Sequence, residues 1–538
     1  MSDGPTFFDA FTRYGPKPFQ HGAQPWRLEH LIEEMDHCSI SGALVTSTAC
    51  TLYDPMRGNL ELVETLAPYD HLFPLWNVMP HWTGEMPEPE ALTALRQEYA
   101  VAAVTLSPTT NGWRIPAATS RPLLDELQRT ATLTILDMRD AGEADVEYLV
   151  EAYPKLPILM VGLGWSRQRW ALPMLLHHRN LHVAFDHFQI NCGLEWLAQR
   201  GCEDQLVYAS NATDMSMGAH RCYVDYADVS DDVRAKVAGG NLVRLLHGVK
   251  PPRVHVNGRE DELMTAGRRG EPLPTPVLDM HTHILDEGLN GAGGAYTMFE
   301  GGPAGVARLA RRMGVDAMGM MSWHGPVATF ADDGNRCVRA ALDAMPDDYW
   351  GLGTFDVVHD SPEQMRRNME ACFADPRMLG LKPYPHYGKH YDHPDYEPWW
   401  HFGEEHGLYA LLHVNRQDLS EIDALAPAWP GLTFVVAHCG SSYVMADHAI
   451  RVARAWPNVM LEITLTPVCM GIVDHLVNGA GADRVVYGSD LPMRDPRQQM
   501  GWVVFSRLGL EAKRQVLGLN ARGMIDAIRR RRRSAVRP

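Results

Sequence analysis

Residues 277–283 read VLDMHTH, and this stretch begins a series of eight short strand-like runs in the second half of the chain. The other seven are AMGMMSW (317–323), WGLGTFD (350–356), LGLKPYP (379–385), YALLHVN (409–415), TFVVAHC (433–439), NVMLEIT (458–464) and RVVYGSD (484–490). Each run is followed by a segment long enough for a helix, which is typical of βαβ units. Eight such units in about 250 residues predict a closed barrel.

The first half of the chain repeats this pattern. FDAFTR (8–13) aligns with LDMHTH (278–283), LVYASN (206–211) with VVYGSD (485–490), and NLVRLL (241–246) with NARGMI (520–525), at offsets of 270 to 279 residues. A chance repeat would not keep its register across so many elements. We therefore predict an α/β chain made of two tandem (β/α)₈ TIM-type barrels, produced by duplication and forming a pseudodimer.

A stretch rich in Pro, Gly and charged residues separates the two halves. We interpret residues 249–275 as an interdomain linker, which leaves one barrel at residues 1–248, a second at 276–527, and a basic tail at 528–538. A chain of 538 residues exceeds what one hydrophobic core supports, and its 45% hydrophobic and 21% charged content is typical of folded globular proteins.

Charge and cysteine usage exclude several classes of partner. The net charge of −17 argues against a nucleic-acid ligand, and the arginine run at 529–533 is interpreted as a solvated tail. Nine cysteines without a CxxC pair suit a reducing compartment. Since no secretory pattern and no run of about 18 apolar residues occurs, we expect a cytoplasmic protein without a membrane partner.

Residue types that bind metals stand at the ends of four strands predicted in the second half. His281 and His283 are two apart in an extended run, so both imidazoles point the same way. His413, His438 and Asp490 end three later runs. All strand carboxyl ends of a barrel open on one face, and we therefore expect these five side chains to converge there.

The first half lacks this set. At the matching positions it carries Phe11, Arg13, Asp137, Gly162 and Asn211. It is not expected to bind a metal in the same way, although Arg13, Asp137 and Asn211 could form a polar pocket. We interpret this half as a structural copy that packs against the active barrel and shapes the rim of its pocket.

The HxH motif, the two later histidines and the Asp of a GSD that precedes Leu-Pro resemble the amidohydrolase superfamily. The most similar branch is the amidohydrolase-related subgroup that includes aminocarboxymuconate-semialdehyde decarboxylase, and the resemblance covers nearly all of residues 276–527. It implies that His281, His283, His413 and Asp490 hold one divalent metal, usually zinc, with manganese or iron as alternatives. The expected catalytic residues are Asp490, which takes a proton from the metal-bound water, and His438, which orients that water or polarises the substrate carbonyl.

The resemblance allows two roles for Lys382. It is either a carboxylated bridge between two metals or a contact for a substrate anion, and we favour the single-metal reading. Further substrate contacts are expected in the loops after the strands, with ordinary packing as the alternative for each residue: Trp323, His324, Tyr384, His386, Tyr387, Arg416 and Arg494.

Three functions remain open on the sequence. The leading hypothesis is a hydrolase that attacks a small-molecule amide, lactone or ester through a metal-activated water. The same ligands serve a non-oxidative decarboxylase, a lyase acting on an aromatic or unsaturated carboxylic acid. The third hypothesis is a non-catalytic metal-binding scaffold. Apart from its small-molecule substrate, the expected partner of the active barrel is the other half of the chain, and further homo-oligomerisation is open.

Overall fold

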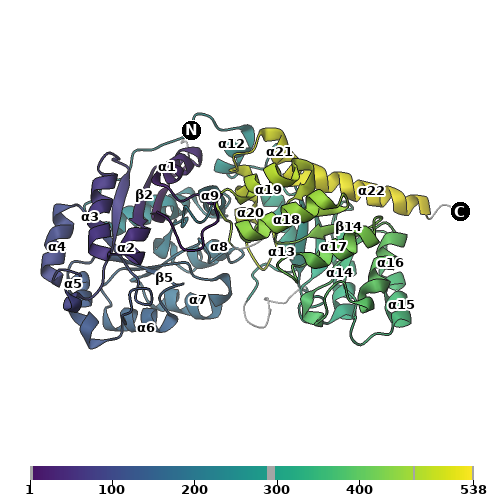
Figure 1. Cartoon of the computed structure of the whole chain (residues 1–538), viewed down its shortest axis with the longest axis horizontal. Helices are drawn as coiled ribbons and strands as arrows, with labels where there is room; N and C mark the ends of the chain where they lie inside the picture. Colours follow the sequence, from purple (N-terminus) through teal and green to yellow (C-terminus); the bar gives the residue numbers. More distant parts are fainter. Residues whose placement is uncertain (1–3, 287–296, 465–466, 536–538) are drawn as a thin grey trace. The chain divides into compact units, whose positions relative to one another are not determined.

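The computed structural model describes residues 4–286, 297–464 and 467–535, and the chain divides into two compact units, Met1–Glu260 and Asp261–Pro538 (Figure 1). The boundary falls inside the stretch expected to be the linker. Each unit contains one eight-stranded parallel sheet whose strands follow one another in sequence order. The prediction of two tandem (β/α)₈ barrels is confirmed, whereas the pseudodimer stays a prediction.

The strands of the first barrel are β1 (Phe8–Tyr14), β2 (Gly42–Ser47), β3 (Leu72–Asn77), β4 (Ala103–Leu106), β5 (Leu133–Asp137), β6 (Ile158–Val161), β7 (Leu181–Ala184) and β8 (Leu206–Val207). Those of the second are β9 (Leu278–Ile284), β10 (Ala317–Ser322), β11 (Trp350–Gly353), β12 (Met378–Leu381), β13 (Tyr409–Leu412), β14 (Thr433–Val436), β15 (Val459–Glu462) and β16 (Val485–Val486). Each of the eight runs predicted in the second half overlaps one of these strands.

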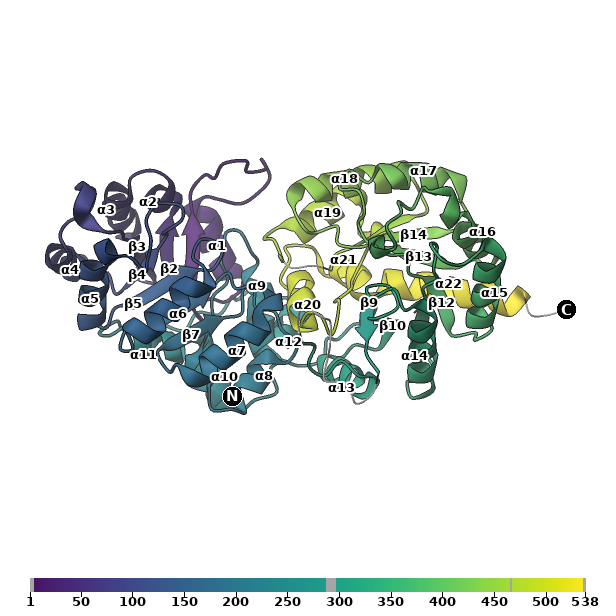
Figure 2. The ribbon, with the colours of Figure 1, turned by 90° about the horizontal axis from the view of Figure 1, so that it is seen from below.

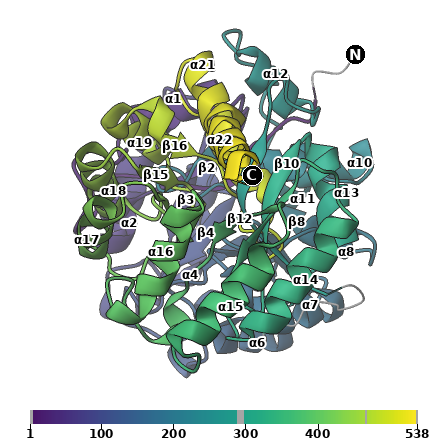
Figure 3. The same cartoon turned by 90° about the vertical axis from the view of Figure 1, so that its right-hand side faces the viewer.

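Helices lie outside the strands of each barrel, as α3 to α7 do in Figure 2 and α13 to α19 in Figure 3. The first unit has α1 (Leu28–His37), α2 (Thr48–Leu52), α3 (Pro55–Leu66), α4 (Pro89–Glu98), α5 (Arg121–Arg129), α6 (Glu143–Ala152), α7 (Gln168–His177), α8 (Gly193–Ala198), α9 (Met217–Asp225), α10 (Asp231–Ala235) and α11 (Asn241–Leu245). The second has α12 (Glu262–Arg268), α13 (Pro303–Met313), α14 (Ala331–Asp343), α15 (Pro362–Phe373), α16 (Glu397–Glu405), α17 (Ser420–Ala428), α18 (Tyr443–Ala455), α19 (Ile472–Ala480), α20 (Pro496–Val504), α21 (Leu510–Arg514) and α22 (Asn520–Ala535).

Burial on both faces explains why the strands are continuous apolar runs. All four residues of β6, Ile-Leu-Met-Val, are buried, because the barrel interior covers one face and the helices cover the other. The helices begin at polar caps, such as Ser361 before α15 and Ser442 before α18, whose hydroxyls accept from backbone N–H groups of the first turn.

Backbone hydrogen bonds close each ring between its first strand and the segment after its last. Ala10 N donates to Tyr208 O at 3.0 Å in the first barrel, and Met280 N donates to Tyr487 O at 3.0 Å in the second. Asp490 N also donates to His281 O at 2.8 Å. Closure therefore brings Asp490, at the end of the barrel sequence, beside the HxH motif at its start.

The two barrels share local details beyond their strand order. Asp9 Oδ1 accepts from the backbone N–H groups of Phe11 and Ser210, as Asp279 Oδ1 does from His281 and Ser489. A π-helical turn occupies Lys236–Gly240 in one and Gln515–Leu519 in the other.

The C-terminal arginines differ from expectation. Residues 528–535, expected to form a solvated tail, continue helix α22, and Arg532 donates to the carbonyls of Phe373 and Met378. Residues 536–538 lie outside the described residues. Among the helices described, none is both long and apolar enough to cross a membrane.

Candidate metal centre

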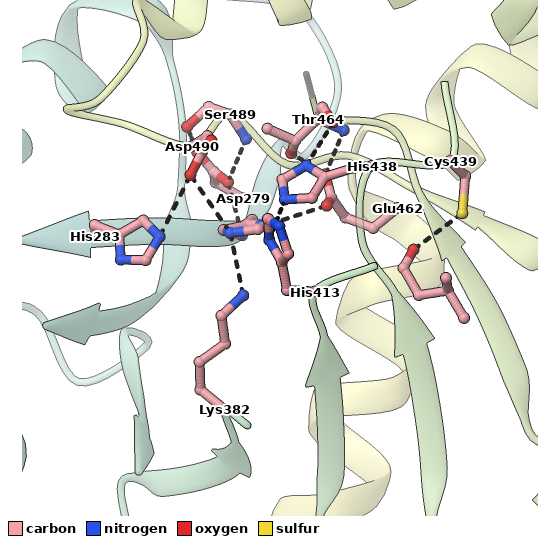
Figure 4. Close-up of polar contacts among 12 residues, drawn as sticks. Asp279, His283, Lys382, His413, His438, Cys439, Glu462, Thr464, Ser489 and Asp490 are labelled. Carbon is pink, nitrogen blue, oxygen red and sulfur yellow. Dashed lines mark hydrogen bonds and ion pairs between the residues drawn. The ribbon is translucent and has the colours of Figure 1, made fainter. Parts of the chain in front are cut away.

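A cluster of polar side chains, buried except for the half-buried His413, lies at the carboxyl ends of the strands of the second barrel (Figure 4). Parallel strands place their carboxyl ends on one face of a barrel, so residues far apart in sequence meet there. The cluster consists of His281 and His283 on β9, Lys382 after β12, His413 after β13, His438 after β14, Glu462 at the end of β15, and Asp490 after β16.

Three donor atoms form the centre of this cluster. One side-chain donor atom each from His281, His283 and Asp490 lies within 4.8 Å of the others, and all three residues are buried. Asp490 Oδ1 lies 3.5 Å from His281 Nε2 and 3.3 Å from His283 Nε2. This oxygen is buried and has no hydrogen-bond partner of acceptable geometry in the described part of the chain.

The outer nitrogens of the two imidazoles are already engaged. His281 Nδ1 donates to Glu462 Oε2 at 3.0 Å, and His283 Nδ1 donates to the Ser322 carbonyl at 3.2 Å. A neutral imidazole carries a single N–H, so each Nε2 presents a lone pair towards Asp490 Oδ1. Burial, followed by the charge of Lys382, holds the pKa of His281 well below its usual value, which keeps that ring neutral.

His413 and His438 are oriented by a chain of hydrogen bonds. The Thr464 carbonyl accepts from His438 Nδ1 at 2.9 Å, which leaves the lone pair of this ring on Nε2. His438 Nε2 lies 2.9 Å from His413 Nδ1 and accepts from it, so the lone pair of His413 is on its own Nε2. His413 is thus in the tautomer that a metal ligand requires, although it is not part of the group of three donors within 4.8 Å.

Arg494 fixes the charge state of Asp490. Its guanidinium donates to Asp490 Oδ2, while Oδ1 faces the histidines. Burial alone would raise the pKa of Asp490, but the Arg494 guanidinium and the neighbouring imidazoles outweigh burial and hold the pKa well below its usual range. The side chain is therefore a carboxylate, as a metal ligand or a proton acceptor must be.

Lys382 and Glu462 flank the His281 ring. Lys382 is fully buried and places Nζ 3.3 Å from His281 Nε2, and burial lowers its pKa to about 8. Burial raises the pKa of Glu462 to about 7, while Oε1 accepts from Thr464 N at 2.6 Å. Sequence reasoning missed Glu462. The available signal was a lone acid closing the apolar run NVMLEIT on the face that carries the other ligand types.

Two of the predicted substrate contacts lie against the cluster. The Trp323 ring packs edge-on to His283 with centroids 5.4 Å apart, and the Tyr384 ring lies 4.6 Å from that of His413. Both aromatic side chains are nearly buried. They form an apolar wall beside the polar centre.

Arg494, also a predicted contact, pairs with Asp490. The remaining four predicted contacts have other partners. His324 Nε2 lies 3.2 Å from Asp333 Oδ2, His386 Nδ1 donates to the Val327 carbonyl at 2.6 Å, and Arg416 Nη1 pairs with Asp392 at 2.9 Å. Tyr387 donates its hydroxyl to the Gly325 carbonyl at 3.1 Å. The structure therefore brings these four residues into contact with groups of the loops and of helix α14, and their role in substrate binding stays a prediction.

Residues 278–526 match the family model described as amidohydrolase. Among curated proteins, none matches the chain. Similar solved structures include an uncharacterised TIM-barrel protein from Bordetella bronchiseptica, 16% identical, which covers 47% of this chain and 99% of its own with a TM-score of 0.39. Two others are 2,6-dihydroxybenzoate decarboxylase from Rhizobium (14% identical, TM-score 0.37) and 5-carboxyvanillate decarboxylase from Sphingomonas paucimobilis (16%, 0.37), each with the same two coverages, 47% and 99%.

Proposed function

We propose that the second barrel is a metal-dependent enzyme of the amidohydrolase superfamily that hydrolyses a small-molecule amide, lactone or ester. The convergence of two imidazole lone pairs on the carboxylate oxygen of Asp490 supports this proposal most strongly. Three electron-pair donors face one another here, with the Lys382 ammonium 3.3 Å from His281 Nε2. A divalent cation would relieve the repulsion among the three donors. The match of residues 278–526 to the amidohydrolase family model also supports it.

The donor set suits zinc, with manganese or iron as alternatives. His281, His283, Asp490 and the Nε2 of His413 would hold the ion, which would act as a Lewis acid and lower the pKa of a water molecule. Glu462 would keep the His281 ring in its binding tautomer, because its carboxylate accepts the Nδ1 proton. The Ser322 carbonyl would do the same for His283.

The protein itself supplies a proton acceptor. Asp490, held as a carboxylate by Arg494, is the residue we assign to remove a proton from the attacking water and return it to the leaving group. His438 is predicted to orient that water. To do so, its Nε2 would have to give up the hydrogen bond that it accepts from His413. With that hydrogen bond in place, His438 positions His413.

A decarboxylase is the second candidate, and Lys382 favours it. This ammonium is fully buried beside His281, where it would pair with the carboxylate of an aromatic or unsaturated acid. A hydrolytic substrate need not carry such an anion. The same lysine, if carboxylated, would instead bridge two metals.

Mass spectrometry of the product separates the two chemistries. The metal-loaded full chain is incubated with a panel of amides, lactones, esters and aromatic acids, and the Asp490→Asn variant is the control. A hydrolase gives products whose combined mass is that of the substrate plus one water, and oxygen-18 from labelled solvent enters the new carboxylic acid. Loss of CO₂ identifies the decarboxylase. Tight metal binding without turnover and without water exchange at the metal would support the scaffold instead.

A further inference from the structure

The first barrel contains a polar cavity at the carboxyl ends of its strands, the end that carries the metal centre in the second barrel. Its volume is about 290 Å³, a size that suits a small molecule. The charged residues that line it are Arg13, Lys17, Asp137, Arg139 and Asp140. Six lining residues carry hydroxyl groups, namely Thr46, Thr48, Thr51, Thr105, Ser107 and Thr110, and Leu52 is the one apolar lining residue.

An ion pair fills the space that His438 takes in the other barrel. Arg139 donates to both oxygens of Asp137, from Nε at 2.8 Å and from Nη2 at 2.5 Å. Gly162, the counterpart of His438, has no side chain, and a Cβ there would lie 2.5 Å from Asp137 Oδ1. With its amide oxygen turned towards Arg139, Asn211 accepts from the same guanidinium at 2.9 and 3.0 Å. The charges of Asp137 and Arg139 thus neutralise each other.

Arg13 remains the cation with the weakest pairing. It occupies the strand position of His283, and its Nη2 lies 3.6 Å from Asp137 Oδ2, beyond hydrogen-bond distance. Its Nε is buried without a hydrogen-bond partner among the described residues. Arg13 therefore places a guanidinium with an unused donor at the cavity, where the second barrel has a metal-binding imidazole.

The remaining charged groups of the cavity already have partners. Asp140 is used within the loops, since it accepts from the backbone N–H groups of Thr109 and Thr110. Lys17 pairs with Asp214. The buried hydroxyl of Thr46 finds no oxygen or nitrogen partner in the described part of the chain. A guanidinium donor without a partner, and a hydroxyl whose contact is the weakly polar Cys50 thiol, suit a ligand that brings oxygen atoms of its own.

We propose that the first barrel binds a small hydroxylated oxyanion, a carboxylate or a phosphate ester, in this cavity. The Arg13 guanidinium contacts the anionic group, supplying a fixed positive charge where the second barrel would use a metal ion. The threonine and serine hydroxyls contact the ligand's own hydroxyl groups. This site is separate from the metal centre and does not depend on the function proposed for the second barrel.

Calorimetric titration of the full chain with two probes tests the proposal. Gluconate represents the hydroxylated carboxylates, and glycerol 3-phosphate represents the hydroxylated phosphate esters. The pocket variants are Arg13→Gln, which removes the charge, and Thr46→Val, which keeps the shape and removes the hydroxyl. Arg57→Gln is the matched control, because Arg57 is exposed on α3 and pairs with Glu61.

We expect one saturable site per chain for at least one probe. Arg13→Gln should weaken its affinity at least tenfold and Thr46→Val several-fold, while Arg57→Gln leaves it unchanged. Binding of one probe alone identifies the anionic group. The proposal is overturned if neither probe binds saturably, or if both pocket variants bind as tightly as the unmodified chain, which would place the anion at the metal centre.

Discussion

In the proposed metal centre, Glu462 acts through its hydrogen bond to His281. Its carboxylate accepts from His281 Nδ1 at 3.0 Å and so directs the lone pair of that ring to the centre. Glu462→Gln keeps the size of the side chain but lets its amide group turn a donor towards the ring. We expect metal affinity to fall by about 10- to 100-fold, measured by competition with a chromophoric chelator.

Glu421→Gln is the control for this substitution. Glu421 is a buried glutamate of the same barrel, and it accepts from the backbone N–H groups of Tyr391 and Arg416. Its loss should change metal affinity little. Equal losses of affinity in the two variants would mean that any buried glutamate matters equally, which contradicts a specific role for Glu462.

A substitution at Gly162 tests the geometry around the Asp137–Arg139 ion pair of the first barrel. Its φ is +68°, and a Cβ would lie 2.5 Å from Asp137 Oδ1. Gly162→Ala should therefore lower the free energy of unfolding by about 2 kcal/mol or more. In the nearby Gly164, φ is −64° and a Cβ meets nothing within 4 Å. Urea unfolding should show that Gly164→Ala hardly changes the free energy of unfolding. An equal loss of stability in the two variants would contradict the steric conflict inferred at Gly162.

The sequence supported predictions for residues whose position follows from strand periodicity. The HxH pair, His438 and Asp490 were expected to converge because they end strands of one barrel, and they do lie together in the structure. Glu462 was missed because its signal, one acid in an apolar run, is weaker than a repeated or spaced motif. His386 and Arg416 lie on loops, whose course depends on contacts such as that between Arg416 and Asp392 that sequence spacing does not encode.

At the scale of elements, strand β7 contains a buried histidine that should make folding stability depend on pH. His182 is 3% exposed, and burial lowers its pKa to about 4. The ring stays neutral in the fold while the unfolded chain becomes protonated below about pH 6.5. The stability present above pH 6.5 is therefore lost as the pH falls towards 4.

His182→Met should remove this pH dependence, because a methionine side chain does not titrate. Methionine is chosen because Met460 has the equivalent position in β15 of the other barrel. Between pH 7 and pH 5 the unmodified chain should lose about 2 kcal/mol more than the variant. Urea unfolding at the two pH values measures the difference. If the difference in free energy of unfolding between the unmodified chain and the variant is the same at both pH values, His182 becomes protonated in the folded state as it does in the unfolded chain.

Strands were easier to predict than the ends of the chain. Apolar runs such as TFVVAHC identify β14 because a strand buried on both faces needs side chains of this kind. A run of like charges usually indicates a solvated segment, so the arginines of residues 529–533 predict a solvated tail. Hydrogen bonds from Arg532 to the carbonyls of Phe373 and Met378 instead fix the end of α22 to the barrel.

At the scale of the whole molecule, we propose that the two barrels arose by tandem duplication. Three shared features support this origin: the strand order, the π-helical turns, and the backbone N–H groups that donate to Asp9 in one barrel and to Asp279 in the other. The second barrel keeps the donor set, whereas the first has Phe11 in its hydrophobic core at the place of His281. Under the two proposals above, the second barrel carries the chemistry and the first binds a different ligand.

If the barrels form a pseudodimer, the second depends on the first. Deleting residues 1–248 should then leave an insoluble or inactive fragment, because apolar surface that the first barrel covers would be exposed. Solubility, gel filtration and turnover of the fragment measure this. A fully active monomeric fragment would reject the pseudodimer while leaving the metal centre untouched.

Metal content tests the central claim most directly. Elemental analysis is made on the chain purified without chelator, on the His281→Ala/His283→Ala variant, and on His177→Ala/His178→Ala as a control pair in the first unit. We predict about one equivalent of zinc, manganese or iron per chain, lost only in the first variant. Two equivalents would point to Lys382 as a carboxylated bridge. No bound metal in the unmodified chain, or metal retained without His281 and His283, would contradict the proposed centre.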